Sequence, residues 1–507
     1  MPLNGIGIER ASSGLGLPAI LEAFLFDTSN PWWQGRPMRP LPPFRRWLFE
    51  PTLQRLKDGL APVTVLRGPR QVGKTTLQEQ IIDHLLHQEG VNPKRIFRVQ
   101  FDEIPPLKGL QDPIASLCHW FQDNILTGSF NEWAHKGEPA FLFFDEVQNL
   151  TDWAPQIKSL VDHHAVKVLL TGSSALRIEQ GRDSLAGRIS TLELGTLLLR
   201  EISALRGWGE LQPLLSFNGL KPLKERDFWE NLREHGLQYS EVRGQAFAAF
   251  SERGGYPVAQ VRFDWPWEEM AAQLNETVIR RVIQHDLRLG DRGRKRNQNL
   301  LEELFRLCCR YAGQAQGQAI FIHELHAALS ETIGWQQVLN YLKFLNDTLL
   351  IRLVNPSEIR IQRRKGQPKI CLCDHSLRAS WLQEIIPVTP AALDLSPHLS
   401  DLAGRIAESI TGYFLGSIPG LDLAWFPERG AEPEVDFVVA VGEYRIPLEI
   451  KYRRHIDGHR DTIGLRTFIE KTVYNAPFGV LVTLTDDVKV ADPRIVTLPL
   501  SSMLLMR

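Results

Sequence analysis

The chain has 507 residues, of which 43% are hydrophobic and 23% charged, and its formal net charge is −1. This composition is ordinary for a folded globular protein, and the length is sufficient for about three domains. A near-neutral charge excludes a globally basic nucleic-acid binder, so any contact with nucleic acid must use a local basic patch. The five cysteines are odd in number and show no paired metal-ligand spacing, which predicts reduced, mostly buried thiols.

The N-terminal segment shows no basic-then-apolar signal pattern, and the longest apolar stretches are too short and interrupted to span a bilayer. These observations predict a cytoplasmic protein without a membrane partner. Within residues 1–60, the first 43 or so are rich in Gly, Pro and Trp and are expected to form an arm that lies on a folded body. An amphipathic helix is predicted over 45–60.

Residues 66–76 carry the pattern around which the chain is organised: Gly68, four free positions, and then Gly73-Lys74-Thr75. This is a complete phosphate-binding loop pattern. A β-branched apolar run precedes it and apolar residues at helical spacing follow it, so the loop joins a buried strand to a helix N-terminus. Free N–H groups and the helix dipole at that point attract phosphate. We expect Lys74 to reach the β- and γ-phosphates of ATP and Thr75 to bind Mg²⁺.

A second apolar strand, 140–146, ends in Asp145 and Glu146. An unbroken apolar run is typical of a strand covered on both faces, as in a parallel sheet. Downstream of a phosphate loop, Asp145 is expected to hold the Mg²⁺ shell and Glu146 to orient the attacking water. The alternative is a strand that merely ends in acidic residues.

A third buried strand, 166–174, ends in small polar residues. In a doubly wound sheet such strand ends lie beside the nucleotide, so Thr171 or Ser173 is predicted to sense the γ-phosphate, and a capped turn is the alternative. Arg188 follows, and it is a candidate to bind a phosphate with its positive charge, either in its own subunit or in a neighbouring one. The alternative is an arginine that is only solvated or salt-bridged. The predicted ATP-binding residues are Gly68, Pro69, Arg70, Gln71, Val72, Gly73, Lys74, Thr75, Thr76, Asp145, Thr171 and Ser173.

Residues 201–295 read as a helical lid with an insertion, and its part from 241 to 290 is expected to pack near the nucleotide. Three amphipathic helices between 297 and 345, followed by two strands around the basic run 360–365, predict a winged-helix domain over 296–380. The third helix offers few base-reading side chains, so the basic run is expected to grip phosphates without reading bases. Packing between domains or subunits is the alternative use.

The C-terminal segment, 396–507, predicts a helix carrying Glu408, three strands, a further helix and a strand. Asp436 and Glu449 fall on adjacent strands joined by a tight turn, and Lys451 shares a strand face with Glu449 because positions two apart point the same way. Two carboxylates can bind Mg²⁺, which polarises a phosphate, while a lysine assists the nucleophile. Glu408, Asp436 and Glu449 are therefore predicted metal ligands, and Asp436, Glu449 and Lys451 predicted catalytic residues. The alternative is a fold kept for packing or binding.

Several runs together resemble one bacterial and archaeal family: Gly-Pro-Arg-Gln-Val-Gly-Lys-Thr-Thr, Phe-Asp-Glu-Val-Gln, Thr-Gly-Ser-Ser, Leu-Ala-Gly-Arg, Gly254-Gly255-Tyr256-Pro257 and the C-terminal acidic stretch. That family joins an AAA-type ATPase core to a C-terminal domain of unknown function related to PD-(D/E)XK nucleases. The resemblance covers roughly residues 30–484, fits 208–240 poorly, and departs at Val435, where the nuclease motif has proline.

The resemblance implies a multidomain α/β protein with a P-loop ATPase core over 61–200, built on a parallel sheet, and a nuclease-like domain at its C-terminus. We expect an ATPase that uses ATP and Mg²⁺ and acts on DNA, with Mg²⁺-dependent cleavage as a further activity. A homo-oligomer is a candidate assembly. The alternative is a nucleotide-dependent signalling or defence switch, in which the C-terminal domain binds partners and cleaves nothing.

Overall fold

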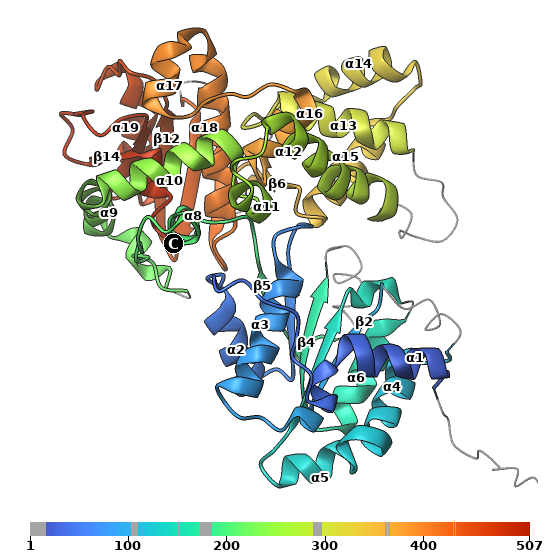
Figure 1. The fold of residues 1–507 in the computed structure, drawn as a ribbon. Coiled ribbons are helices and arrows are strands. Elements are labelled where there is room, and N and C mark those ends of the chain that lie inside the picture. The colour runs from blue at the N-terminus through green and yellow to red at the C-terminus, as the bar shows by residue number, and fades with distance from the viewer. Residues whose placement is uncertain are drawn as a thin grey trace, which may run out of the picture. The chain divides into compact units, whose positions relative to one another are not determined.

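A computed structural model describes most of the chain as two compact units (Figure 1). The first unit holds the described residues up to 192 except the loop 68–73, and the second holds that loop and the residues from 193 onward. The described residues are 17–102, 110–150, 152–172, 185–217, 219–286, 297–359, 362–363, 366–428, 430 and 432–507.

A five-stranded sheet forms the centre of the first unit, in the order β2-β3-β4-β1-β5. The pairs β1–β4, β2–β3 and β3–β4 are parallel, as the unbroken apolar runs predicted. Every residue of β3 is buried, which places this strand inside the core. The strands are β1 (Val63–Arg67), β2 (Ile96–Gln100), β3 (Ala140–Asp145), β4 (Val166–Gly172) and β5 (Ile189–Glu193).

Helices surround this sheet, and the longest, α3, begins at the lysine of the phosphate loop. The helical elements of the unit are α1 (Ala19–Phe24), η1 (Leu25–Ser29), η2 (Pro31–Gln34), α2 (Phe49–Asp58), α3 (Lys74–His87), η3 (Pro93–Arg95), α4 (Pro113–Phe121), η5 (Gln122–Leu126), α5 (Phe130–His135), η6 (Val147–Asn149) and α6 (Trp153–His163). The sequence predicted α2 over 45–60, somewhat longer than it is.

The N-terminal arm lies along β2, the strand at one end of the sheet order. The Asn30 side chain accepts a hydrogen bond from the Arg98 backbone N–H at 2.7 Å and donates to the Arg98 carbonyl at 3.0 Å. Trp32 and Trp33 both donate their indole N–H to the carbonyl of Ile96. These contacts satisfy backbone groups that an edge strand would otherwise expose. The described part of the predicted arm therefore includes short helices, is held to β2 by hydrogen bonds and covers that edge strand.

The segment after β5 is helical, and its contacts run to the C-terminal part of the second unit. Helix α9 packs on β14 (Ile495–Pro499) and on α20 (Leu500–Met503), and Arg243 of α10 pairs with Asp486 at 2.6 Å. The lid near the nucleotide, which the sequence predicts for these helices, stays a prediction. The elements are α8 (Leu199–Arg206), η7 (Lys221–Lys224), α9 (Arg226–Gln238), α10 (Ser240–Arg253), α11 (Pro257–Val261), α12 (Trp267–Leu274), η8 (Asn275–Arg280) and η9 (Val282–Asp286).

Three helices and four short strands follow, where the sequence predicted three helices and two strands, and the winged-helix assignment stays a prediction. Strands β6 and β9 pair antiparallel, as do β7 and β8. Gln336, Gln337, Asn340 and Lys343 of the third helix are exposed. The basic side chains between 360 and 365 lie outside the described residues. The elements are α13 (Gln298–Arg310), α14 (Gln318–Leu329), α15 (Trp335–Asp347), β6 (Ile351–Val354), β7 (Glu358–Ile359), β8 (Gln362–Arg363) and β9 (Lys369–Leu372).

A second five-stranded sheet forms the C-terminal part, in the order β10-β11-β12-β13-β14. The first two pairs are antiparallel and the last two parallel. The sequence predicted the first four strands within two residues but missed β14. The elements are α16 (His375–Leu382), α17 (Pro390–Leu395), η10 (Pro397–Leu399), α18 (Ser400–Gly416), β10 (Asp422–Phe426), β11 (Val435–Val441), β12 (Tyr444–Lys451), η11 (Arg460–Thr462), α19 (Ile463–Glu470), η12 (Thr472–Tyr474), β13 (Gly479–Thr483) and the pair β14 and α20.

Among the described residues, no helix combines the length and the apolar character needed to cross a membrane.

Candidate nucleotide site and C-terminal acidic cluster

The phosphate loop adopts a backbone that few residue types permit. Gln71 has a φ of 63° and Gly73 a φ of 92°, both in the left-handed region that favours glycine. Gly68 is constrained by space, because a Cβ there would lie 2.1 Å from the carbonyl oxygen of Leu194. The loop leads from β1 directly into α3, so its N–H groups stand at a helix N-terminus, as the sequence predicted.

Thr75 and Asp145 meet at the carboxyl ends of the strands. The Thr75 hydroxyl donates to Asp145 Oδ2 at 2.8 Å, and Asp145 is 2% exposed. Hydroxyl and carboxylate oxygens are the ligands that Mg²⁺ prefers, so this pair fits the ion that the loop pattern implies. Burial, and then the charge of Glu146, raise the pKa of Asp145, while hydrogen bonds from Thr171 and Thr75 act in the opposite direction. A nearby cation would favour the charged carboxylate.

A buried polar network holds the other oxygen of Asp145. Thr171, fully buried at the end of β4, donates its hydroxyl to Asp145 Oδ1. Gln78 of α3 donates to Thr171 at 3.3 Å and accepts from Arg98 Nε at 3.2 Å. Arg98 also pairs with Glu79 at 3.1 Å. The predicted phosphate sensor Thr171 thus contacts the carboxylate, and it connects Asp145 to β2 through α3.

Sequence reasoning missed Gln78, Glu79 and Arg98. The signal was present in the sequence, because Gln78 and Glu79 lie among the apolar positions of a helix that packs on a sheet. Their burial to 0% and 4% exposure requires polar partners, and Arg98 supplies them from a strand that reads as purely structural.

Glu146 follows β3 in the left-handed conformation, with a φ of 50°. Its backbone N–H donates to Asp145 Oδ1 at 3.1 Å, and its carboxylate accepts a hydrogen bond from the Gln148 side chain. A non-glycine residue in this backbone region is uncommon and often marks a functional position. The hydrogen bond from Gln148 thus holds the Glu146 carboxylate next to the strand end that carries Asp145.

The remaining residues predicted to bind ATP lie in the loop or outside the described residues. Lys74 opens α3 and is 6% exposed, and Val72 is fully buried. Pro69 and Arg70 lie in the loop, Thr76 lies in the first turn of α3, and Ser173 lies outside the described residues.

Arg188 lies at the opposite edge of the sheet from the phosphate loop. Its carbonyl accepts the N–H of Val63, the first residue of β1, whereas the loop follows the last residue of that strand. Its guanidinium pairs with Asp162 at 3.0 Å, and that hydrogen bond raises the pKa of Arg188. The predicted role in cis does not fit this placement. A role from a neighbouring subunit stays a prediction.

The C-terminal cluster brings together the residues predicted there. The antiparallel register of β11 and β12 pairs Phe437 with Leu448. One position further along, the same register places Asp436 opposite Glu449. Asp436 Oδ2 accepts the backbone N–H of Ile450 at 2.8 Å, and Lys451 pairs with Glu449 Oε1 at 2.6 Å. The same sheet face thus holds both carboxylates and the lysine.

A residue that the sequence did not predict sits among these carboxylates. Lys369, the first residue of β9, places its Nζ 2.9 Å from Asp436 Oδ1, 2.9 Å from Glu434 Oε1 and 3.4 Å from Glu408 Oε2. Among the described residues, no group of three or more His, Cys, Asp or Glu is arranged to hold a metal ion. Of the predicted ligands, Glu408 and Asp436 face the Lys369 ammonium group, whereas Glu449 pairs with Lys451, so the metal site stays a prediction. The sequence did not reveal the contacts of Lys369, because this residue belongs to β9, which is far from the cluster residues in sequence and reaches them only through the tertiary fold.

The electrostatics of the cluster follow from burial and crowding. Burial lowers the pKa of Lys369, but the charges of Asp436, Glu408 and Glu434 outweigh it and hold that pKa well above its usual value. Burial, and then the Asp436 charge, raise the pKa values of Glu408 and Glu449 despite the lysines beside them. The cluster thus carries an excess of carboxylates over its cations.

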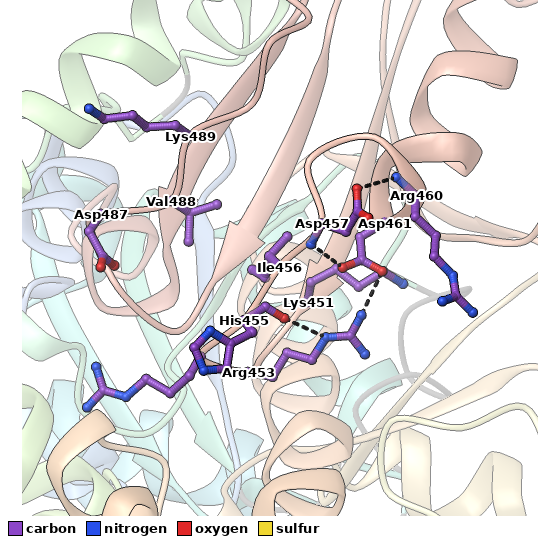
Figure 2. A pocket seen from close by; sticks show the side chains of 11 residues that line it. Lys451, Arg453, His455, Ile456, Asp457, Arg460, Asp461, Asp487, Val488 and Lys489 are labelled. Atoms are coloured by element: carbon purple, nitrogen blue, oxygen red, sulfur yellow. Dashed lines mark hydrogen bonds and ion pairs between the residues drawn. The ribbon is translucent and has the colours of Figure 1, made fainter.

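Lys451 also lines a pocket of about 800 Å³ at the end of β12 (Figure 2). Figure 2 shows Arg453 joined to Asp461 and to the carbonyl of His455, while other cations line the opening. The lining is rich in cations and also holds three carboxylates: Lys451, Arg453, Arg454, His455, Ile456, Asp457, Arg460, Asp461, Asp487, Val488 and Lys489. A polar, cation-rich pocket suits an anionic ligand.

Family models match two segments of the chain. Residues 61–203 match a model described as AAA domain, which covers the parallel sheet and the phosphate loop. The chain carries an AAA-type P-loop ATPase domain. Residues 244–385 match a model described as a domain of unknown function, DUF8612, and this match runs from within α10 to the end of α16, including the strands β6 to β9. Neither of these two segments includes the C-terminal sheet.

Two curated relatives share sequence with part of the chain: uncharacterized proteins Mb2031c of Mycobacterium bovis and Rv2008c of Mycobacterium tuberculosis. Each is 29% identical over 157 residues, which is 30% of this chain and 29% of the relative's length. The matched part of the chain thus spans less than a third of either relative.

Among solved structures, the Walker-type ATPase PABY2304 of Pyrococcus abyssi aligns with 67% of this chain and 96% of its own, at 15% identity and a TM-score of 0.36. The Aeropyrum pernix ORC1 protein, solved in complex with DNA, aligns with 68% of this chain and 94% of its own, at 13% identity and a TM-score of 0.28. These low scores carry no argument about function.

Proposed function

We propose that the AAA domain binds and hydrolyses ATP. The observation that carries this proposal is the contact between Thr75 and the buried Asp145 directly behind a phosphate loop. The loop N–H groups and Lys74 bind the phosphates, and Glu146 orients water for attack on the γ-phosphate. Mg²⁺, when bound at Thr75 and Asp145, neutralises phosphate charge. The Thr171–Gln78–Arg98 network fixes the Asp145 carboxylate in position.

Equilibrium binding of a fluorescent ATP analogue tests the first half of this proposal. Lys74→Ala is expected to abolish binding, because Lys74 is the side chain expected to reach the β- and γ-phosphates. Lys57→Ala is the control, since Lys57 pairs with Glu89 on the surface of the same unit. Full affinity in Lys74→Ala, with the fold intact by circular dichroism, would disprove the assignment.

A second candidate function, the processing of DNA, is favoured by two features of the second unit. One is the cation-rich pocket beside Lys451, in which the side chains of His455, Arg460 and Lys489 make no hydrogen bond or ion pair with the described residues. The other is the meeting of Asp436, Glu449 and Lys451 on one sheet face, as in phosphodiester-cleaving sites of the PD-(D/E)XK type. Lysine and arginine in such a pocket bind backbone phosphates whatever the base sequence.

The salt dependence of binding to duplex DNA tests this candidate. Replacing Arg460 and Lys489 by Ala is expected to weaken binding of all sequences alike and to reduce the salt slope by about one for each phosphate that the protein no longer neutralises. The corresponding change of Arg363, Arg364 and Lys365 tests the predicted wing in the same assay. Unchanged slopes in both variants would favour the alternative, a nucleotide-dependent switch whose C-terminal domain binds protein partners.

A further inference from the structure

Lys369 is 2% exposed, and its ammonium group faces several carboxylates at once. Taking a charge out of water is costly unless partners surround it. The ammonium group also lies 5.4 Å from the ring centroids of Trp425 and Phe437, within the range of cation–π attraction. The surroundings of Lys369 are thus built to hold a cation.

The carboxylates around that position come from different elements. Glu408 lies on α18, Glu434 just before β11 and Asp436 on β11, while Lys369 enters from β9. Divalent ions of the Mg²⁺ type bind to oxygen ligands gathered in this way. One ammonium group therefore stands where several carboxylate oxygens converge.

A further oxygen points to an incomplete site. Glu449 is 8% exposed, its Oε1 pairs with Lys451, and its Oε2 is buried without a hydrogen-bond partner among the described residues. Buried polar atoms are nearly always satisfied, so an unsatisfied carboxylate oxygen beside Asp436 indicates a place for a positive group that the side chains do not supply. Lys369 forms an ion pair with Asp436, and it does not give Glu449 Oε2 a partner.

We propose that Lys369 is a displaceable internal cation, which occupies the position of a divalent metal ion and must leave it before Glu408, Asp436 and Glu449 can bind one. The inference rests on the metal site that the sequence predicts at the C-terminal cluster and is independent of ATP hydrolysis. Since Lys369 belongs to β9, and β9 packs on α18, metal binding at the cluster requires β9 or its first side chain to shift. The winged-helix-like strands and the cluster are thereby coupled.

Mn²⁺ titration of the nucleotide-free full-length protein tests the proposal, with bound metal followed by electron paramagnetic resonance. Lys369→Met is expected to bind Mn²⁺ at the cluster at least about tenfold more tightly than the wild type, because a positive charge no longer competes for the carboxylates. Adding Asp436→Ala is expected to remove that site and so to separate it from Mn²⁺ held at Thr75 and Asp145. Lys471→Met, which removes a lysine that follows α19 and pairs with Glu432, is expected to leave Mn²⁺ binding unchanged.

The outcomes separate the two ideas. Equal affinity in the wild type and Lys369→Met, abolished in both by Asp436→Ala, would keep the metal site and overturn the role of Lys369. Absence of an Asp436-dependent site in both proteins would overturn the metal site and the inference together, and would identify Lys369 as a fixed structural partner. Lys369→Gln, which retains a hydrogen-bond donor, repeats the test if the methionine variant does not fold. A wild-type site that is already tight and depends on Asp436 would refute the proposal without any lysine variant.

Discussion

Gly68→Ala is expected to damage the nucleotide site through a backbone collision. A Cβ at residue 68 would lie 2.1 Å from the carbonyl oxygen of Leu194 and 3.2 Å from Val72 Cγ2. Because the closest atom belongs to the backbone, the loop itself must shift. Overpacking of this kind costs about 1–3 kcal/mol. If that cost falls on the phosphate-binding conformation, ATP affinity decreases roughly 5- to 150-fold.

Fluorescence anisotropy with a labelled ATP analogue measures the effect, and thermal unfolding shows whether the fold survives. Gly244→Ala is the matched control, because Gly244 lies in α10 and a Cβ there meets no atom within 4 Å. This control is expected to bind ATP normally and to gain up to about 1 kcal/mol of stability from better helix propensity. Wild-type ATP affinity in a stable Gly68→Ala protein would refute the reasoning that the loop must keep its present path.

Three further predictions concern other parts of the chain. Thr171→Val removes the hydroxyl that donates to Asp145, so it is expected to slow ATP turnover and to lower the unfolding free energy by about 1–3 kcal/mol, measured by steady-state kinetics and urea denaturation. Arg188→Ala is expected to leave ATP affinity in equilibrium binding unchanged, because Arg188 lies at the far sheet edge; a large loss would contradict that placement. Gly412→Ala is expected to cost about 1–3 kcal/mol in denaturation, since its Cβ would lie 2.7 Å from the Phe437 ring.

Local patterns account for the parts of the fold that the sequence predicted. The phosphate loop and the strand ending in Asp145 are each encoded within about ten consecutive residues, as are the strands 435–441 and 444–451 with their two-residue turn. Such patterns identify an element and the face on which its residues lie. They were sufficient to predict that Thr75 and Asp145 belong to one region and that Asp436 faces Glu449.

Contacts between distant segments account for what the sequence did not reveal. Lys369 reads as the start of a wing strand, and nothing in its neighbourhood indicates that it enters an acidic cluster 67 residues away. Asn30 falls in the predicted arm, and nothing around it indicates that its side chain pairs with the edge of β2. Arg188 resembles a phosphate-binding arginine, yet the path of β5 carries it to the wrong edge of the sheet for a role in cis. Packing decides these positions, and a single sequence carries no direct record of packing.

The most direct test of the central claim compares ATP turnover in the wild type and in Glu146→Gln under equal conditions with Mg²⁺. The account predicts measurable hydrolysis by the wild type, and in Glu146→Gln retained ATP binding with turnover reduced by about 100-fold or more, because the water is no longer oriented. Equal rates of hydrolysis in the two proteins, or no hydrolysis by a wild type that binds ATP, would contradict it.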